Sequence, residues 1–166
     1  MEPLDMLGMG HRGKLPIEDA LLTIAVCTAE SGKKAGFSYI PRIFSLAIAD
    51  PLFSHISGNI ESLKKRVYHL VNAITVGNQK KFVDLAITSL PLELKEKALA
   101  WAADMAVENG ILTDERNQFL EALAAKLSID SDVAHRITDV SAIGKRTLRR
   151  DTENEKRPCQ HEDIAA

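Results

Sequence analysis

The stretch that decides the fold is Ala20-Leu-Leu-Thr-Ile-Ala-Val-Cys-Thr-Ala29, ten consecutive residues without a charged side chain. It lies within a longer run, Ile17 to Glu30, which Pro16 can start and Gly32 can stop. A helix that is apolar on nearly every side is usually buried in the middle of a bundle. The stretch therefore predicts a central helix with other helices packed around it.

The composition of the whole chain agrees with a helical domain. Its 166 residues include 20 alanines and 19 leucines, both strong helix formers, and 45% of the residues are hydrophobic. Only 9 glycines and 6 prolines are present, and aromatic residues make up 5%. Sandwiches and barrels need more turn residues and more aromatic or β-branched strands, so we expect an all-α fold.

Six further helices follow from apolar residues at helical spacing and from the turn residues between them. Neighbouring helices joined by short connections pack antiparallel, so we predict about seven antiparallel helices in one domain over residues 16–144. Residues 1–15 are expected to be an arm and residues 145–166 a polar, mobile tail. The predicted interior faces include Ile48 and Ile60, with Val140 as a further candidate. The six helices cover about 38–49, 59–76, 79–89, 91–108, 113–127 and 130–143.

Charge and cysteine content limit the classes of function. Lys and Arg number 21 against 23 Asp and Glu, a formal net charge of −2, so we expect no nucleic-acid partner. Cys27 and Cys159 are far apart and are expected to be unpaired thiols, with Cys27 serving as packing. Because neither a long apolar run nor a secretory signal is evident, we expect a cytoplasmic protein.

Two parts of the chain resemble each other. Ala20-Leu21 and Ala29-Glu-Ser-Gly32 align with Ala98-Leu99 and Val107-Glu-Asn-Gly110 at an offset of 78 residues. After the turn the offset becomes 75, so that Ser38 matches Thr113. Repetition of such a unit predicts two helical hairpins related by a pseudo-twofold axis. The alternative is chance, because any two amphipathic Ala/Leu hairpins resemble each other.

The second of these turns, residues 108–115, could carry chemistry. Gly110 permits a positive φ where one helix ends, and Thr113 can cap the next helix. Oxygen-bearing side chains surround this turn, as hard cations such as Ca²⁺ or Mg²⁺ prefer. The alternative is that the acids only complement the dipole of the following helix. The candidate metal ligands are Glu108, Asn109, Asp114 and Glu115.

The apolar helix, the acidic-x-Gly turn, the Thr cap and an acid five residues after the glycine resemble the TerB-like domain, a helical family associated with tellurite resistance. The resemblance covers about Ile17 to Ile129. Asn109 stands where the family usually has Asp, and Tyr39 and Ile40 stand near where the first copy would carry its acid. The resemblance implies an all-α, non-enzymatic binding module in tellurite resistance or in chemical or envelope stress. It also implies protein partners near the cytoplasmic membrane surface, and a homodimer is left open.

Other patterns add little chemistry. The histidines lack the spacing of a helical metal site, and no phosphate loop or nucleophile motif is present, so we expect no enzyme. Lys64-Lys-Arg66 is expected to be a solvated helix face. The basic segment from Lys145 to Arg150 could extend the last helix and contact anionic lipid or an acidic partner. A second hypothesis is therefore a structural or regulatory interaction protein with no metal and no link to tellurite.

Overall fold

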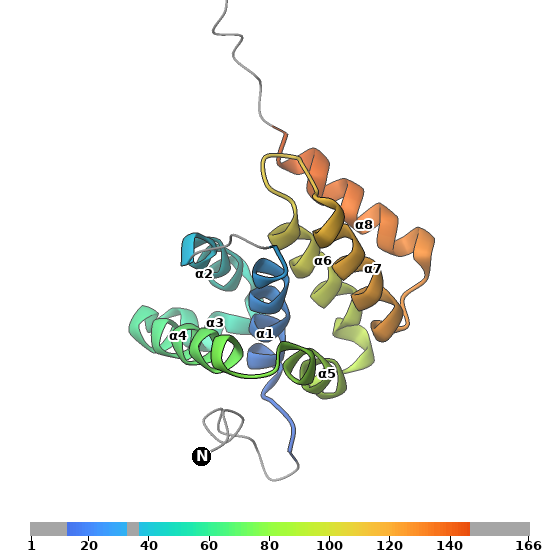
Figure 1. Cartoon of the computed structure of the whole chain (residues 1–166). Coiled ribbons are helices and arrows are strands. Elements are labelled where there is room, and N and C mark those ends of the chain that lie inside the picture. Colours follow the sequence, from blue (N-terminus) through green and yellow to red (C-terminus); the bar gives the residue numbers. More distant parts are fainter. Residues whose placement is uncertain (1–12, 33–36, 147–166) are drawn as a thin grey trace, which may run out of the picture.

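The computed structural model describes residues 13–32 and 37–146, and these residues fold as helices joined by turns (Figure 1). The predicted all-α class is confirmed, with one helix more than expected because a short turn of helix, α3, precedes α4. No strand is present among the described residues. The helices are α1 (Ile17–Glu30), α2 (Ile40–Ala49), α3 (Ser54–Ser57), α4 (Ile60–Val76), α5 (Gln79–Ser89), α6 (Lys95–Ala106), α7 (Asp114–Leu127) and α8 (Ser131–Gly144).

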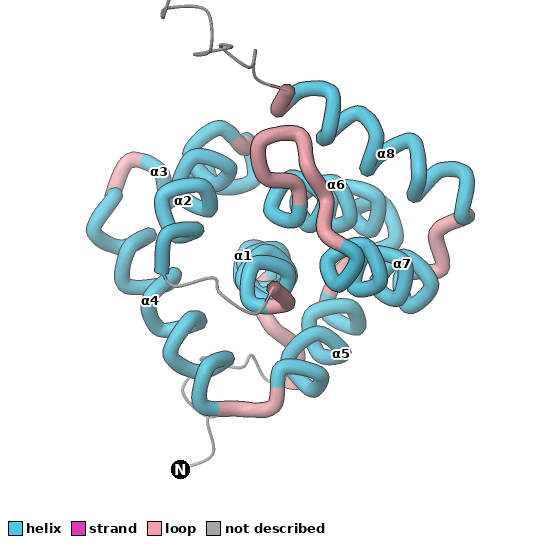
Figure 2. The backbone as a smooth tube through the Cα atoms, turned by 45° about the horizontal axis from the view of Figure 1, so that its top comes forward, coloured by secondary structure: helices cyan, strands magenta, loops and turns pink. Residues whose placement is uncertain are grey.

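Helix α1 forms the centre of the molecule. Figure 2 shows it end-on, with α2, α4, α5, α6 and α7 around it. All eleven residues from Asp19 to Ala29 are buried, as the uncharged stretch predicted. Its most extensive neighbours are α5 and α6, followed by α4. Because the buried part of α1 has no solvated face, the neighbouring helices must cover it on every side.

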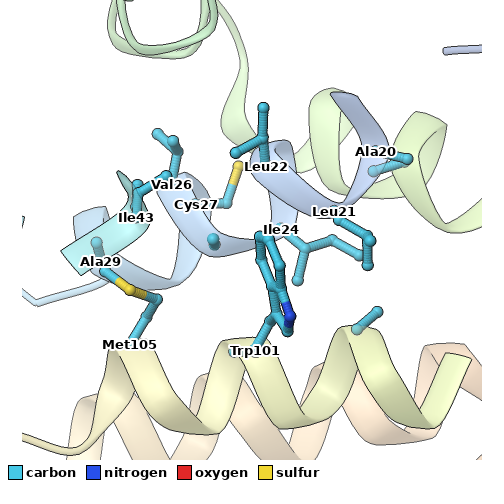
Figure 3. Close-up of a cluster of buried hydrophobic side chains, with 14 of the residues drawn as sticks. Ala20, Leu21, Leu22, Ile24, Val26, Cys27, Ala29, Ile43, Trp101 and Met105 are labelled. Carbon is cyan, nitrogen blue, oxygen red and sulfur yellow. The ribbon is translucent and has the colours of Figure 1, made fainter. Parts of the chain in front are cut away.

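Side chains from α1 project in opposite directions into this core (Figure 3). Trp101 and Met105 of α6 lie on one side of α1, whereas Leu22 and Cys27 point away from α6. The Trp101 ring also stacks on Phe53, with ring centroids 5.5 Å apart. Cys27 is fully buried, and burial raises the pKa of its thiol to about 12, in keeping with its predicted packing role.

The hydroxyl groups of the two buried threonines of α1 are satisfied within the helix itself. The Thr23 hydroxyl donates to the Asp19 carbonyl oxygen at 2.6 Å, and the Thr28 hydroxyl donates to the Ile24 carbonyl oxygen at 2.7 Å. Such bonds to the preceding turn let a threonine occupy a fully apolar environment. Two threonines therefore do not prevent α1 from being buried on all sides.

The two predicted hairpins pack differently. Helix α7 packs extensively on α6, whereas α2 makes few contacts with α1 and lies instead against the turn that follows it. Both α1 and α6 end at the same end of the molecule, so this central pair is parallel, whereas α6 and α7 run antiparallel. The pseudo-twofold relation between the hairpins stays a prediction.

Three residues predicted to face the core are exposed. Ile48, Ile60 and Val140 have 52%, 55% and 70% of their surface accessible. Ile60 is the first residue of α4, and Ile48 lies near the end of α2. Val140 belongs to α8, an outer helix with no fully buried residue. Apolar spacing predicted the helices correctly and these three orientations wrongly.

The domain extends slightly beyond its predicted limits. Leu15, placed in the arm by the sequence analysis, is buried, and its backbone N–H donates to the Ser89 hydroxyl oxygen at 2.9 Å. Lys145, predicted to open the tail, contacts α6. Residues 1–12 of the arm and residues 147–166 of the tail, which include Cys159, lie outside the described residues.

One predicted solvated residue is partly buried. Lys64 and Lys65 are exposed as expected, but Arg66 places its Nε 2.5 Å from Oδ1 of Asp19, a carboxylate that is only 6% exposed at the residue level. Burial raises the pKa of Asp19 above its ordinary value of 3.8, because desolvation outweighs the attraction of the Arg66 guanidinium. The carboxylate charge is therefore a net cost to the folded state.

This cost gives a pH-dependent prediction. A raised folded-state pKa means that the native protein holds the Asp19 proton more tightly than the unfolded chain does. The contribution of Asp19 is therefore most favourable below pH 3.8 and is lost as the pH rises through the folded-state pKa. We expect the stability of the Asp19→Asn variant relative to the wild type to increase between pH 3 and pH 7, measured by urea unfolding.

The matched control is Asp84→Asn, which breaks the exposed Asp84–Lys126 ion pair. Its effect should vary little over the same pH range, because exposed pairs contribute little to stability. If the wild type instead gained stability over Asp19→Asn with rising pH, attraction to Arg66 would outweigh desolvation.

Candidate functional site

The predicted functional turn lies beside its counterpart from the first hairpin. The ends of α1 and α6 line a cleft with a volume of about 420 Å³. The starts of α2 and α7 and the residues just before them also line it. The lining residues are Ala29, Gly32, Ser38, Tyr39, Arg42, Met105, Glu108, Thr113, Glu115 and Arg116. The two turns that the sequence comparison aligned therefore share one cleft.

The turn between α6 and α7 has the backbone that the sequence predicts. Glu108 and Ile111 exchange two backbone hydrogen bonds of 2.9 Å, which close the loop. Asn109 and Gly110 have φ angles of +52° and +77°, the left-handed region that these two residue types tolerate best. The hydroxyl of Thr113 accepts a bond from the Arg116 N–H at 3.4 Å, which confirms the predicted cap of α7.

The four candidate metal ligands are not gathered around one point. Glu108 and Glu115 line the cleft, whereas Asn109 and Asp114 do not. Within the described residues, no three His, Cys, Asp or Glu side chains are grouped as a metal ion would require. The nearest partner of Glu108 is a cation, since Nη1 of Arg116 lies 3.3 Å from its Oε2. Binding of Ca²⁺ or Mg²⁺ stays a prediction that this geometry does not favour.

Three cations instead gather at the end of α6. The last carbonyl groups of a helix have no partner within the helix, and its C-terminus carries partial negative charge. Arg116 donates from Nη1 to the Ala106 carbonyl oxygen at 3.1 Å. Arg42 donates from Nη2 to Val107 at 2.9 Å, and Lys145 donates from Nζ to the same oxygen at 3.3 Å. Arg42 and Lys145 both also contact the Asp104 carbonyl oxygen. We call Arg42, Arg116 and Lys145 the cationic cap.

The sequence analysis missed the cationic cap. Helix α6 has no basic residue in its own last turn, and residues from other helices bond to its last carbonyl groups. Arg42, Arg116 and Lys145 belong to α2, α7 and the end of α8. Their convergence depends on tertiary packing, which local patterns do not report.

The position of Lys145 differs from the prediction that the basic segment from Lys145 to Arg150 contacts lipid or an acidic partner. Its Nζ lies 2.8 Å from Oδ1 of Asp104, and only about a fifth of its side chain is exposed. Burial and the nearby Arg42 lower the pKa of Lys145, and the Asp104 carboxylate partly opposes this effect. Lys145 therefore bonds to α6, and its ammonium group does not face outward toward a lipid surface. Residues 147–150 of the segment lie outside the described residues.

Tyr39 occupies the position where the first copy was expected to carry an acid. Its hydroxyl donates to Oε1 of Glu30 at 2.5 Å. Burial and the Glu30 carboxylate both raise the pKa of Tyr39, so the phenol stays protonated at neutral pH. This bond ties the start of α2 to the end of α1.

Gly32 leaves room for Arg116. A Cβ atom at Gly32 would lie 2.9 Å from Nε of Arg116. That Nε is buried and has no hydrogen-bond partner in the described part of the chain. The guanidinium thus lies between the C-terminal ends of both central helices, with one edge bonded to α6 and the other facing α1.

Comparisons with known proteins add no assignment: no family model, no curated protein and no solved structure matches the chain. None of the helices in the described ranges is both long enough and apolar enough to cross a bilayer.

The capping bond from Arg116 to Ala106 and the ion pair between Arg116 and Glu108 can be tested separately. We expect Arg116→Met to lower the free energy of unfolding by about 1.5–3 kcal/mol, the usual range for a bond that involves a charged group. Glu108→Gln should cost less than about 0.5 kcal/mol, because the Glu108 side chain is 66% exposed. Urea unfolding of both variants measures the difference. Equal losses would mean that the ion pair, and not the capping bond, is what stabilises this turn.

Proposed function

We propose that this protein is a non-enzymatic binding module, and that its ligand is a small molecule with a carboxylate or phosphate group bound in the cleft between α1 and α6. The observation that carries the proposal is that two guanidinium groups line the cleft with donors to spare. Arg42 bonds to the protein only through Nη2 and Arg116 only through Nη1, as far as the described residues show.

The shape of the cleft supports this proposal. Sites for small molecules usually measure roughly 300–1,000 Å³ and combine apolar walls with a few polar groups. This cleft measures about 420 Å³, and Ala29 and Met105 supply apolar surface beside the arginines. Guanidinium groups bind carboxylate and phosphate through paired hydrogen bonds, which makes an oxyanion the best-matched ligand group.

The acidic residues of the cleft restrict the ligand further. Glu108 forms an ion pair with Arg116, but Glu115 makes no side-chain ion pair with a described residue. A carboxylate repels a simple anion and attracts an ammonium group. We therefore favour a small zwitterion, with its oxyanion toward the arginines and its amine toward Glu115.

The biological setting remains a proposal from the resemblance to the TerB-like family. It supports a role in tellurite resistance or chemical stress, in the cytoplasm or at the inner surface of the membrane, together with protein partners. The alternative is a regulatory interaction protein outside that response. Stress-response genes beside this gene would favour the first setting, and their absence the second.

The test is a calorimetric titration of the full chain with phosphate, acetate and glutamate at constant ionic strength, with chloride as the reference anion. We expect Arg42→Gln to weaken binding by about 10- to 150-fold, the equivalent of losing one charged hydrogen bond. The matched control is Arg136→Gln, an exposed arginine of α8 that does not line the cleft. Circular dichroism checks that both variants are folded.

A second variant distinguishes a direct loss of ligand binding from a loss caused by misfolding. Glu115 is exposed, so Glu115→Gln should leave the fold intact, strengthen phosphate binding and weaken glutamate binding. The proposal fails if phosphate and the carboxylates bind no better than chloride. It also fails if Ca²⁺ or Mg²⁺, and not oxyanions, shift the NMR signals of Glu108 to Glu115 and Glu115→Gln abolishes that shift.

A further inference from the structure

A second pocket lies between α5 and α7, and it shares no lining residue with the cleft. Its volume is about 240 Å³. Val83, Phe119, Ala122 and Leu123 form its apolar walls, and Gln79, Lys80 and Lys126 surround them. The Gln79 side chain is held in place by α1, because its Nε2 donates to the Cys27 carbonyl oxygen at 2.6 Å. This α5–α7 pocket therefore combines an apolar interior with two lysines.

We propose that the α5–α7 pocket binds an acidic amphipathic segment of a partner protein, with one bulky apolar side chain inserted and carboxylates on Lys80 and Lys126. This surface is independent of the small-molecule cleft. It would make the protein an adaptor that joins a ligand site on one surface to a protein contact on another.

The size of the pocket favours a side chain over a free ligand. At about 240 Å³ it is smaller than the roughly 300–1,000 Å³ of typical small-molecule sites. Protein interfaces commonly depend on a few bulky side chains that fill well-packed pockets of the partner. A lipid surface would need a broad apolar face, which a single pocket of this size does not provide.

The charges around the pocket favour an acidic partner. Lys80 forms no ion pair with a described residue, and it belongs to an exposed pair with Lys81. Nζ of Lys126 lies 2.5 Å from Oδ1 of Asp84, but both side chains are substantially exposed. Exposed pairs are weak, so a partner carboxylate can replace Asp84 at Lys126. Rim charges of this kind steer the partner and set its orientation.

The probe for this proposal is a fluorescein-labelled helical peptide with Leu and Phe at i, i+3, i+4 and i+7 and Glu or Asp at the remaining positions. Its binding to the full chain is followed by fluorescence anisotropy. The control peptide has Lys in place of every acid. We expect the acidic peptide to bind, the lysine peptide not to bind, and the affinity to fall with added salt.

Matched variants test the pocket itself. Ala122→Leu places a side chain into the pocket and should weaken peptide binding about tenfold or more, whereas Ala125→Leu should not. Both alanines are exposed on α7, but Ala125 lines the groove between α7 and α8 instead. Lys80→Glu should weaken binding strongly and Lys81→Glu only slightly, because Lys81 does not line the pocket.

Other results would overturn the proposal. A loss of peptide affinity with Ala125→Leu but not with Ala122→Leu would place the peptide in the α7–α8 groove. Equal losses of affinity for Lys80→Glu and Lys81→Glu would indicate general charge attraction. Binding to phosphatidylserine vesicles without binding to the peptide would indicate a membrane surface. Arg42→Gln should leave peptide affinity unchanged, so this proposal and that of the cleft can fail separately.

Discussion

The complete burial of one helix is the constraint on which the rest of this structure depends. Helix α1 hides every residue from Asp19 to Ala29, so helices must cover it on all sides. The hydrophobic effect supplies the driving force, and the threonine hydroxyls stay satisfied because they bond to the preceding turn of the same helix. Asp19 marks where burial is most costly, because there a carboxylate enters the interior and relies on Arg66.

The parallel arrangement of α1 and α6 creates the candidate site. Two helix C-termini with partial negative charge meet at one end of the molecule, and Arg42, Arg116 and Lys145 come from three other helices to bond to the end of α6. The same arginines line a cleft and retain donors. A feature that stabilises the fold thereby also supplies the groups of the proposed binding site. Glu108 and Glu115, two of the acids first interpreted as metal ligands, line the same cleft.

Local signals made much of this fold predictable. Thr113 caps α7 as expected, and the uncharged stretch of α1 correctly predicted a central helix. The orientation of Ile60 was predicted wrongly: it is the first residue of α4 and is exposed, because apolar spacing alone does not show which residues at a helix end are covered. The cationic cap was not predictable: Arg42 meets Val107 across 65 residues, and no local pattern encodes such a contact. The backbone and the cap of the turn at residues 108–115 were predicted correctly, but the cations beside it come from distant parts of the chain.

The central claim is that α1 is the buried hub of the fold, and amide hydrogen exchange tests it most directly. Amides in the core of a domain exchange only through global unfolding, whereas those of peripheral elements exchange through smaller openings. The account predicts that the amides of Leu21 to Cys27 are the slowest in the protein and share one free energy of exchange. Helix α8, with no fully buried residue, should exchange much faster. Protection in α8 equal to or greater than that in α1 would contradict the account.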